Sequence, residues 1–125
     1  MVLGLGARSG VREKELAEAI NAALAAAGLY PDRIAVLATL DRRAAEAGVI
    51  AVAGRFGWEL VAFPAAELAA VAVPNPSPVV AAAVRTAGVA EAAALLAAGP
   101  EARLVLTKRT YPRVTIAVAR SPRQP

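Results

Sequence analysis

The chain has 125 residues, of which 58% are hydrophobic and 19% are charged, so it is long enough for one full core and too apolar to be disordered. It contains neither Cys nor His, which excludes disulfides, thiolate or imidazole metal sites, and Ser-His-Asp or Cys-His catalysis by these residues. The formal net charge is +4, but no basic stripe is interleaved with aromatic residues, so we keep nucleic-acid binding only as an alternative.

Strand and helix patterns alternate through the first half of the chain. Short apolar runs predict buried strands, and apolar residues that recur every four positions, as at Leu16, Ile20 and Leu24, predict helices. In chain order we expect a strand over 1–5, a helix over 12–27, a strand over 34–40, a helix over 42–57 with Gly48 as a candidate break, a strand over 59–63 and a short helix over 64–70.

The second half opens with a proline-rich stretch. Alternating prolines at 74, 76 and 78 exclude helix there and favour an extended backbone. After it we expect helices over 79–84 and 89–98, strands over 103–107 and 113–119, and a frayed tail over 121–125. Too few residues separate the last two strands for a crossover helix, so we expect them to be antiparallel neighbours.

This alternation predicts the fold class. Strands that alternate with helices indicate an α/β domain with helices on both faces of the sheet, and the last two strands make that sheet mixed. We therefore expect residues 1–125 to form one three-layer α/β/α domain with a mixed, mostly parallel sheet of about five strands. The residues expected in its core are Leu16, Ile20, Leu24, Val36, Leu37, Val105 and Ile116.

Neither a membrane span nor a signal peptide is predicted. The longest uncharged stretch, between Glu67 and Arg85, contains three prolines, whereas a spanning helix needs about 20 apolar residues. The N-terminal apolar run has no basic residues before it and is interrupted at Arg8. We expect a cytoplasmic protein.

A glycine-rich loop follows the first predicted strand, in the position where open α/β sheets bind ligands. The residues of interest are Gly4, Gly6, Arg8 and Gly10. Glycines allow close approach of the backbone, and the N-terminus of the next helix offers N–H groups to an anion. The same residues also fit a plain strand-to-helix turn, and their spacing is not that of a dinucleotide-binding loop.

Polar residues follow the other predicted strands. Thr39 and Asp41 follow the second strand, where Asp41 is expected to cap the next helix and can also face a ligand. Asn75 and Ser77 are held between prolines, either to aim a side chain at a ligand or to cap a helix. Lys108 follows the fourth strand, as a ligand-binding cation or as a solvated edge charge. If the first three strands are parallel, all these residues line one cleft.

The order and spacing of these motifs resemble those of a known family. Besides the residues above, the resemblance includes Arg43 and Glu46, the segment 89–93 and the closing run 114–120. Together they are similar to the CobE/CbiG C-terminal domain family of cobalamin (vitamin B12) biosynthesis, from about residue 4 to residue 120. Family members often carry Cys in place of Ala7 and Lys in place of Arg43, so no thiol or amine role is expected at these positions.

The resemblance implies a function, with alternatives. Because the chain begins directly at the first strand, it looks like the stand-alone CobE form, which implies binding of a polycarboxylate corrinoid intermediate as a carrier or accessory factor. The expected partners are the corrinoid (tetrapyrrole) intermediate itself and other enzymes of the corrin pathway. We expect the protein to hold no cofactor and no metal. The first alternative is a hydrolase like the longer CbiG proteins, which look like enzymes that open a δ-lactone and release acetaldehyde, with Asp41 or Lys108 as acid–base group. The second is a small basic nucleic-acid-binding domain.

Overall fold

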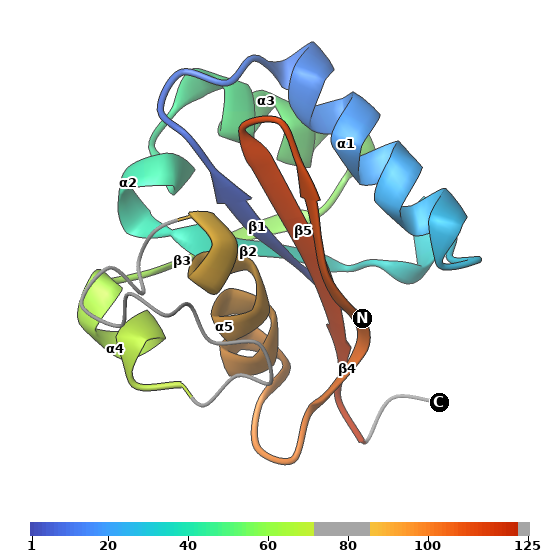
Figure 1. The fold of residues 1–125 in the computed structure, drawn as a ribbon, viewed down its shortest axis with the longest axis vertical. Coiled ribbons are helices and arrows are strands. Elements are labelled where there is room, and N and C mark those ends of the chain that lie inside the picture. The colour runs from blue at the N-terminus through green and yellow to red at the C-terminus, as the bar shows by residue number, and fades with distance from the viewer. Residues whose placement is uncertain (72–85, 123–125) are drawn as a thin grey trace.

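Five strands form one mixed sheet with helices on both faces in the computed structural model, which describes residues 1–71 and 86–122 (Figure 1). The strands are β1 (Val2–Ala7), β2 (Val36–Leu40), β3 (Glu59–Phe63), β4 (Arg103–Tyr111) and β5 (Val114–Arg120). The helices are α1 (Glu13–Ala26), α2 (Asp41–Ala44), α3 (Ala47–Phe56), α4 (Ala65–Ala69) and α5 (Thr86–Ala98), with a 3-10 turn at Pro31–Arg33. The predicted α/β/α fold class is confirmed.

The sheet order is β3-β2-β1-β5-β4. Strands β1, β2 and β3 are parallel, and β5 runs antiparallel to both β1 and β4. Strand β4 therefore runs in the same direction as β1. As a result, the carboxyl ends of β1, β2, β3 and β4 and the start of β5 lie at one edge of the sheet, and the predicted antiparallel pairing of the last two strands is confirmed.

One face of the sheet is covered by α1 and α3. Alternate residues of the central strands, Leu3, Leu5 and Ile116, are fully buried against Leu16 and Ile20 of α1. The four-residue spacing of large apolar side chains along α1 supplies this contact, because it places them on one side of the helix. The predicted core residues of this helix are therefore confirmed.

The other face is covered by α4 and α5, and α5 lies very close to β1 (Figure 1). A Cβ atom at Gly4 would stand 1.9 Å from the carbonyl oxygen of Ala90 and 2.9 Å from Cβ of Ala94. The absence of a side chain in the middle of β1 and the alanines of α5 together allow this approach. Gly4 is thus a packing residue within a strand.

Two predicted strands are longer in the structure, and one predicted helix is divided. Pairing of β1 with β5 continues to Ala7 opposite Val114, and pairing of β4 with β5 continues to Tyr111 opposite the same residue. The predicted ends at residues 5 and 107 are therefore wrong, because strand pairing extends beyond the apolar runs. The helix predicted over 42–57 is split into α2 and α3, and Gly48 lies inside α3 instead of marking the break.

The remaining core predictions have mixed outcomes. Leu24, Leu37 and Ile116 are buried, as expected. Val105 is 41% exposed because β4 lies at the end of the described sheet, so that prediction is wrong, and Val36 is only partly buried. The helix predicted over 79–84 lies outside the described residues, as do residues 123–125. No helix in the described part of the chain is long and apolar enough to span a bilayer.

Candidate functional site

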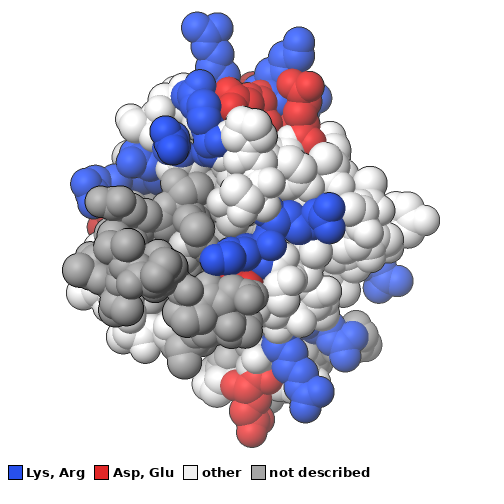
Figure 2. All heavy atoms as spheres, viewed as in Figure 1, with Lys and Arg blue, Asp and Glu red and all other residues white. Residues whose placement is uncertain are grey.

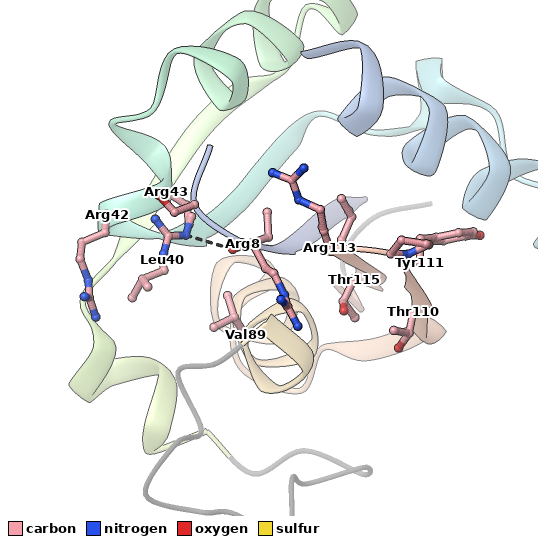
Figure 3. A pocket seen from close by; sticks show the side chains of 13 residues that line it. Arg8, Leu40, Arg42, Arg43, Val89, Thr110, Tyr111, Arg113 and Thr115 are labelled. Atoms are coloured by element: carbon pink, nitrogen blue, oxygen red, sulfur yellow. Dashed lines mark hydrogen bonds between the residues drawn. The ribbon is translucent and has the colours of Figure 1, made fainter. Parts of the chain in front are cut away.

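A cavity of about 710 Å³ opens at the edge of the sheet where β1, β2 and β4 end (Figure 3). Its walls come from the loop after β1, the start of α2, the first described turns of α5, and the turn between β4 and β5. The lining residues are Ala7, Arg8, Ser9, Leu40, Arg42, Arg43, Val89, Thr110, Tyr111, Pro112, Arg113, Val114 and Thr115. Among the described residues, this lining combines four arginines with apolar side chains and contains no acidic residue.

Two of the four arginines carry free cationic groups. Arg8 and Arg42 are both exposed, and neither guanidinium takes part in a hydrogen bond or ion pair with the described residues. In Figure 3 the side chain of Arg8 extends from the end of β1 past Val89 of α5. Lys and Arg side chains also cover more of the face shown in Figure 2 than Asp and Glu side chains do. The cavity therefore offers positive charge to a ligand.

Arg43 has a different role, because its guanidinium braces the loop that carries Arg8. Its Nε donates a hydrogen bond to the carbonyl oxygen of Ala7 at 2.9 Å, and Nη1 donates to Oε2 of Glu46. The other carboxylate oxygen, Oε1 of Glu46, accepts the backbone N–H of Gly10 at 3.0 Å. Gly10 has φ +78°, a conformation that glycine adopts without strain. The loop between β1 and α1 is thus fixed from both ends.

The turn between β4 and β5 forms the opposite wall. Tyr111 and Val114 are paired, which leaves Pro112 and Arg113 as a two-residue turn. The carbonyl oxygen of Arg113 accepts the backbone N–H of Arg8 at 3.0 Å, so the turn is joined to the loop after β1. The guanidinium of Arg113 lies 3.6 Å from Oε1 of Glu15 on α1.

Of the residues predicted after the first two strands, only Arg8 lines the cavity. Gly4 and Gly6 lie within β1, and Thr39 is fully buried, with its hydroxyl donating to the carbonyl oxygen of Leu5 at 2.6 Å. These three residues therefore belong to the central strands of the sheet, and Gly10 lies in the loop whose backbone donates to Glu46. The predicted capping role of Asp41 is wrong: Asp41 is the first residue of α2, the capping position is held by Leu40, and no side-chain hydrogen bond closes that end.

Lys108 lies inside β4 and does not line the cavity. Its backbone N–H donates to Oε2 of Glu91 at 3.0 Å, where the pairing of β4 with β5 shifts register between Leu106 and Arg109. Glu91 is fully buried on α5. A buried carboxylate therefore accepts a backbone donor at an irregularity of the sheet. Asn75 and Ser77 lie outside the described residues.

Of the described lining residues only Arg8 was a sequence candidate, and the arginines Arg42 and Arg113 appear neither among those candidates nor in the resemblance. Arg42 belongs to a pair of arginines directly after the second strand, a signal comparable to that of Lys108. Arg113 follows Pro112 between two β-rich runs, which is typical of a tight turn at a strand end. Among the described residues, no group of three or more acidic side chains is placed to hold a metal ion.

Comparison with known proteins identifies relatives over nearly the whole chain. The family model described as "Cobalamin synthesis G C-terminus" matches residues 1–119. A protein named CobE from a Sinorhizobium species is 39% identical over 121 residues, which cover 95% of this chain and 79% of that protein. A cobalt-precorrin-5A hydrolase from Priestia megaterium is 31% identical over 122 residues, which cover 98% of this chain and 32% of the hydrolase. The chain thus spans about a third of the hydrolase's length.

A solved structure agrees with these matches. The crystal structure of a CobE described as a protein from the cobalamin (vitamin B12) biosynthetic pathway is similar to this one, with a TM-score of 0.83 and 29% sequence identity. The similarity covers 95% of this chain and 88% of that one. Sequence and structure therefore point to the same group of proteins.

Proposed function

Because the chain belongs to the cobalamin synthesis G C-terminal family, a family of cobalamin biosynthesis, we propose that it binds a polycarboxylate corrinoid intermediate as a carrier or accessory factor. One observation carries this proposal. In the described part of the chain, the residues that line the cavity at the carboxyl edge of the sheet include four arginines and no acidic residue.

The chemistry of the lining suits such a ligand. Corrinoid intermediates have apolar ring faces and a fringe of carboxylates, so they need an apolar wall flanked by cations. Leu40, Val89 and Val114 supply apolar surface, and Arg8 in the loop after β1 and Arg42 in α2 supply guanidinium groups. A guanidinium can bind a carboxylate through two parallel hydrogen bonds. Two arginines on separate elements can therefore engage two carboxylates of one ring.

Binding is favoured over hydrolysis because of the groups that face the cavity. Asp41 and Lys108, the acid–base candidates from the sequence, do not line it. The described lining holds the phenol of Tyr111 and arginine guanidinium groups, which donate hydrogen bonds and accept none. General acid–base catalysis needs a group whose pKa lies near the working pH, and the described lining offers no carboxylate, amine or imidazole.

The test is a spectrophotometric titration with cobyrinic acid, whose side chains end in carboxylates, and with cobinamide, in which these are amides. We expect tighter binding of cobyrinic acid, and a loss of about 1–3 kcal/mol, or about five- to 150-fold in Kd, for Arg8→Ala and for Arg42→Ala. Arg103→Ala is the matched control, because Arg103 is an exposed arginine at the opposite end of β4.

Three outcomes would contradict the proposal. If neither corrinoid binds, or if Arg8→Ala and Arg42→Ala bind cobyrinic acid as the unchanged protein does, the cavity is not a corrinoid site. If a corrinoid is converted to product at substoichiometric protein, the chain is an enzyme and not a carrier.

A further inference from the structure

The backbone of Arg113 has a conformation that arginine rarely adopts. Its φ is +67°, and Glu101, with φ +65°, is the other residue besides glycine with positive φ in the described chain. In a tight turn whose first residue is proline, a positive φ at the next position is usually supplied by Gly or Asn, because a Cβ atom is strained there. An arginine at position 113 is therefore unfavourable for the turn itself.

The contacts of Arg113 within the protein do not account for this choice. Its carbonyl oxygen accepts the N–H of Arg8, but any residue at this position supplies a carbonyl oxygen. Its guanidinium pairs with Glu15, and the two side chains are 46% and 39% exposed. Exposed ion pairs of this kind contribute little to stability. A strained residue that lines a cavity is more readily explained by a role in that cavity.

The side chain is placed so that it can change partners. In Figure 3 the guanidinium of Arg113 points toward α1, while that of Arg8 extends in the other direction, although the two residues are joined through their backbones. Arg113 lines the same cavity as Arg8 and Arg42. Because water competes for a half-exposed ion pair, a second carboxylate in the cavity can replace Glu15 at small cost.

We propose that Arg113 is a ligand-binding residue whose guanidinium is held by the Glu15 carboxylate in the unliganded protein and is transferred to a carboxylate of the bound corrinoid. This inference rests on the proposed function and adds to it a residue and an exchange. No covalent bond changes, because one ion pair is replaced by another. The Glu15 carboxylate then competes with the ligand for the same cation.

The experiment compares four variants by cobyrinic acid titration and by thermal unfolding. Arg113→Gly removes the guanidinium and relieves the strained φ, so we expect at least a tenfold rise in Kd with a Tm that is unchanged or up to about 3–5 °C higher. Glu101→Gly is the matched control, since it relieves the same conformation outside the cavity; we expect a similar Tm effect and an unchanged Kd. Arg113→Lys keeps the positive charge but loses the planar guanidinium that can form two parallel hydrogen bonds. Its Kd should therefore lie between that of the unchanged protein and that of Arg113→Gly.

Glu15→Gln separates the exchange from a purely structural role. Without the competing carboxylate, we expect Kd for cobyrinic acid to fall a fewfold. A rise in Kd for Glu15→Gln, or a Kd of Arg113→Gly equal to that of the unchanged protein, would refute the exchange. If Arg8→Ala and Arg42→Ala still weaken binding in that case, the proposed function stands and only the role of Arg113 is wrong. If none of the variants at Arg8, Arg42 and Arg113 changes Kd, both the proposed function and the role of Arg113 are wrong.

Discussion

The close approach of α5 to β1 at Gly4 predicts that Gly4→Ala is strongly destabilising. The new Cβ would stand 1.9 Å from the carbonyl oxygen of Ala90, and real Cβ atoms are almost never closer than 3.0 Å to such an atom. Helix α5 would therefore have to move by more than 1 Å. Overpacking in a core costs about 1–3 kcal/mol, and here the two nearest atoms belong to the backbone of Ala90 and cannot move away as a flexible side chain can, so we expect at least about 3 kcal/mol. In urea unfolding, a loss of about 3 kcal/mol corresponds to a midpoint lower by about 1–3 M.

Gly54→Ala is the matched control for this substitution. Gly54 lies in α3, is exposed, and has nothing within 4 Å of the position that a Cβ would take. Alanine at an ordinary helix position is more favourable than glycine by about 0.5–1 kcal/mol, so the midpoint should rise. A Gly4→Ala variant that unfolds at the same urea concentration as the unchanged protein would show that α5 does not lie against β1 as described. The control detects any general effect of added alanine.

Three further outcomes are expected. Ile116→Ala should lower the free energy of unfolding by about 2–5 kcal/mol, because Ile116 is fully buried in a central strand, and a near-neutral result in urea unfolding would contradict that burial. Thr39→Val should cost about 0.5–1.5 kcal/mol by losing the hydrogen bond to Leu5 while leaving the Kd for cobyrinic acid unchanged, so a selective loss of binding would instead place Thr39 at the ligand. Binding of cobyrinic acid should weaken as salt is raised from low to physiological concentration, since exposed charges are screened over about 8–10 Å, and a Kd independent of salt would argue against guanidinium–carboxylate contacts.

Most of the fold could be predicted from the sequence because local patterns and the buried faces agree. The four-residue spacing of Leu16, Ile20 and Leu24 predicts a helix with one apolar side, and each of these residues is buried in the structure. The short connection before β5 requires antiparallel pairing. The errors lie where pairing with a neighbour decides the outcome: β1 and β4 continue past their apolar runs because β5 offers partners as far as Val114.

The site was harder to predict because the same residue types serve two purposes. Glycine in the first motif suggests a loop, but Gly4 is needed for helix packing and Gly6 is paired with Thr115 inside the sheet. Lys108 looks like a strand-end cation, but strand β4 continues to Tyr111. Only three-dimensional contacts distinguish these cases. A cavity does lie at the edge to which the sequence assigned the candidate residues, but among the described candidates only Arg8 lines it.

The arginines around the cavity differ in what already compensates their charge, and this difference determines what they can do for a ligand. Glu46 compensates Arg43, whose guanidinium also holds the carbonyl oxygen of Ala7, so Arg43 is committed to structure. Glu15 compensates Arg113 across 3.6 Å between exposed side chains, a pairing weak enough to be exchanged. Arg8 and Arg42 have no acidic partner among the described residues. If the proposed exchange takes place, an anionic ligand would meet two uncompensated cations on entering and would gain a third when Arg113 leaves Glu15, whereas an uncharged analogue would gain none of these ion pairs.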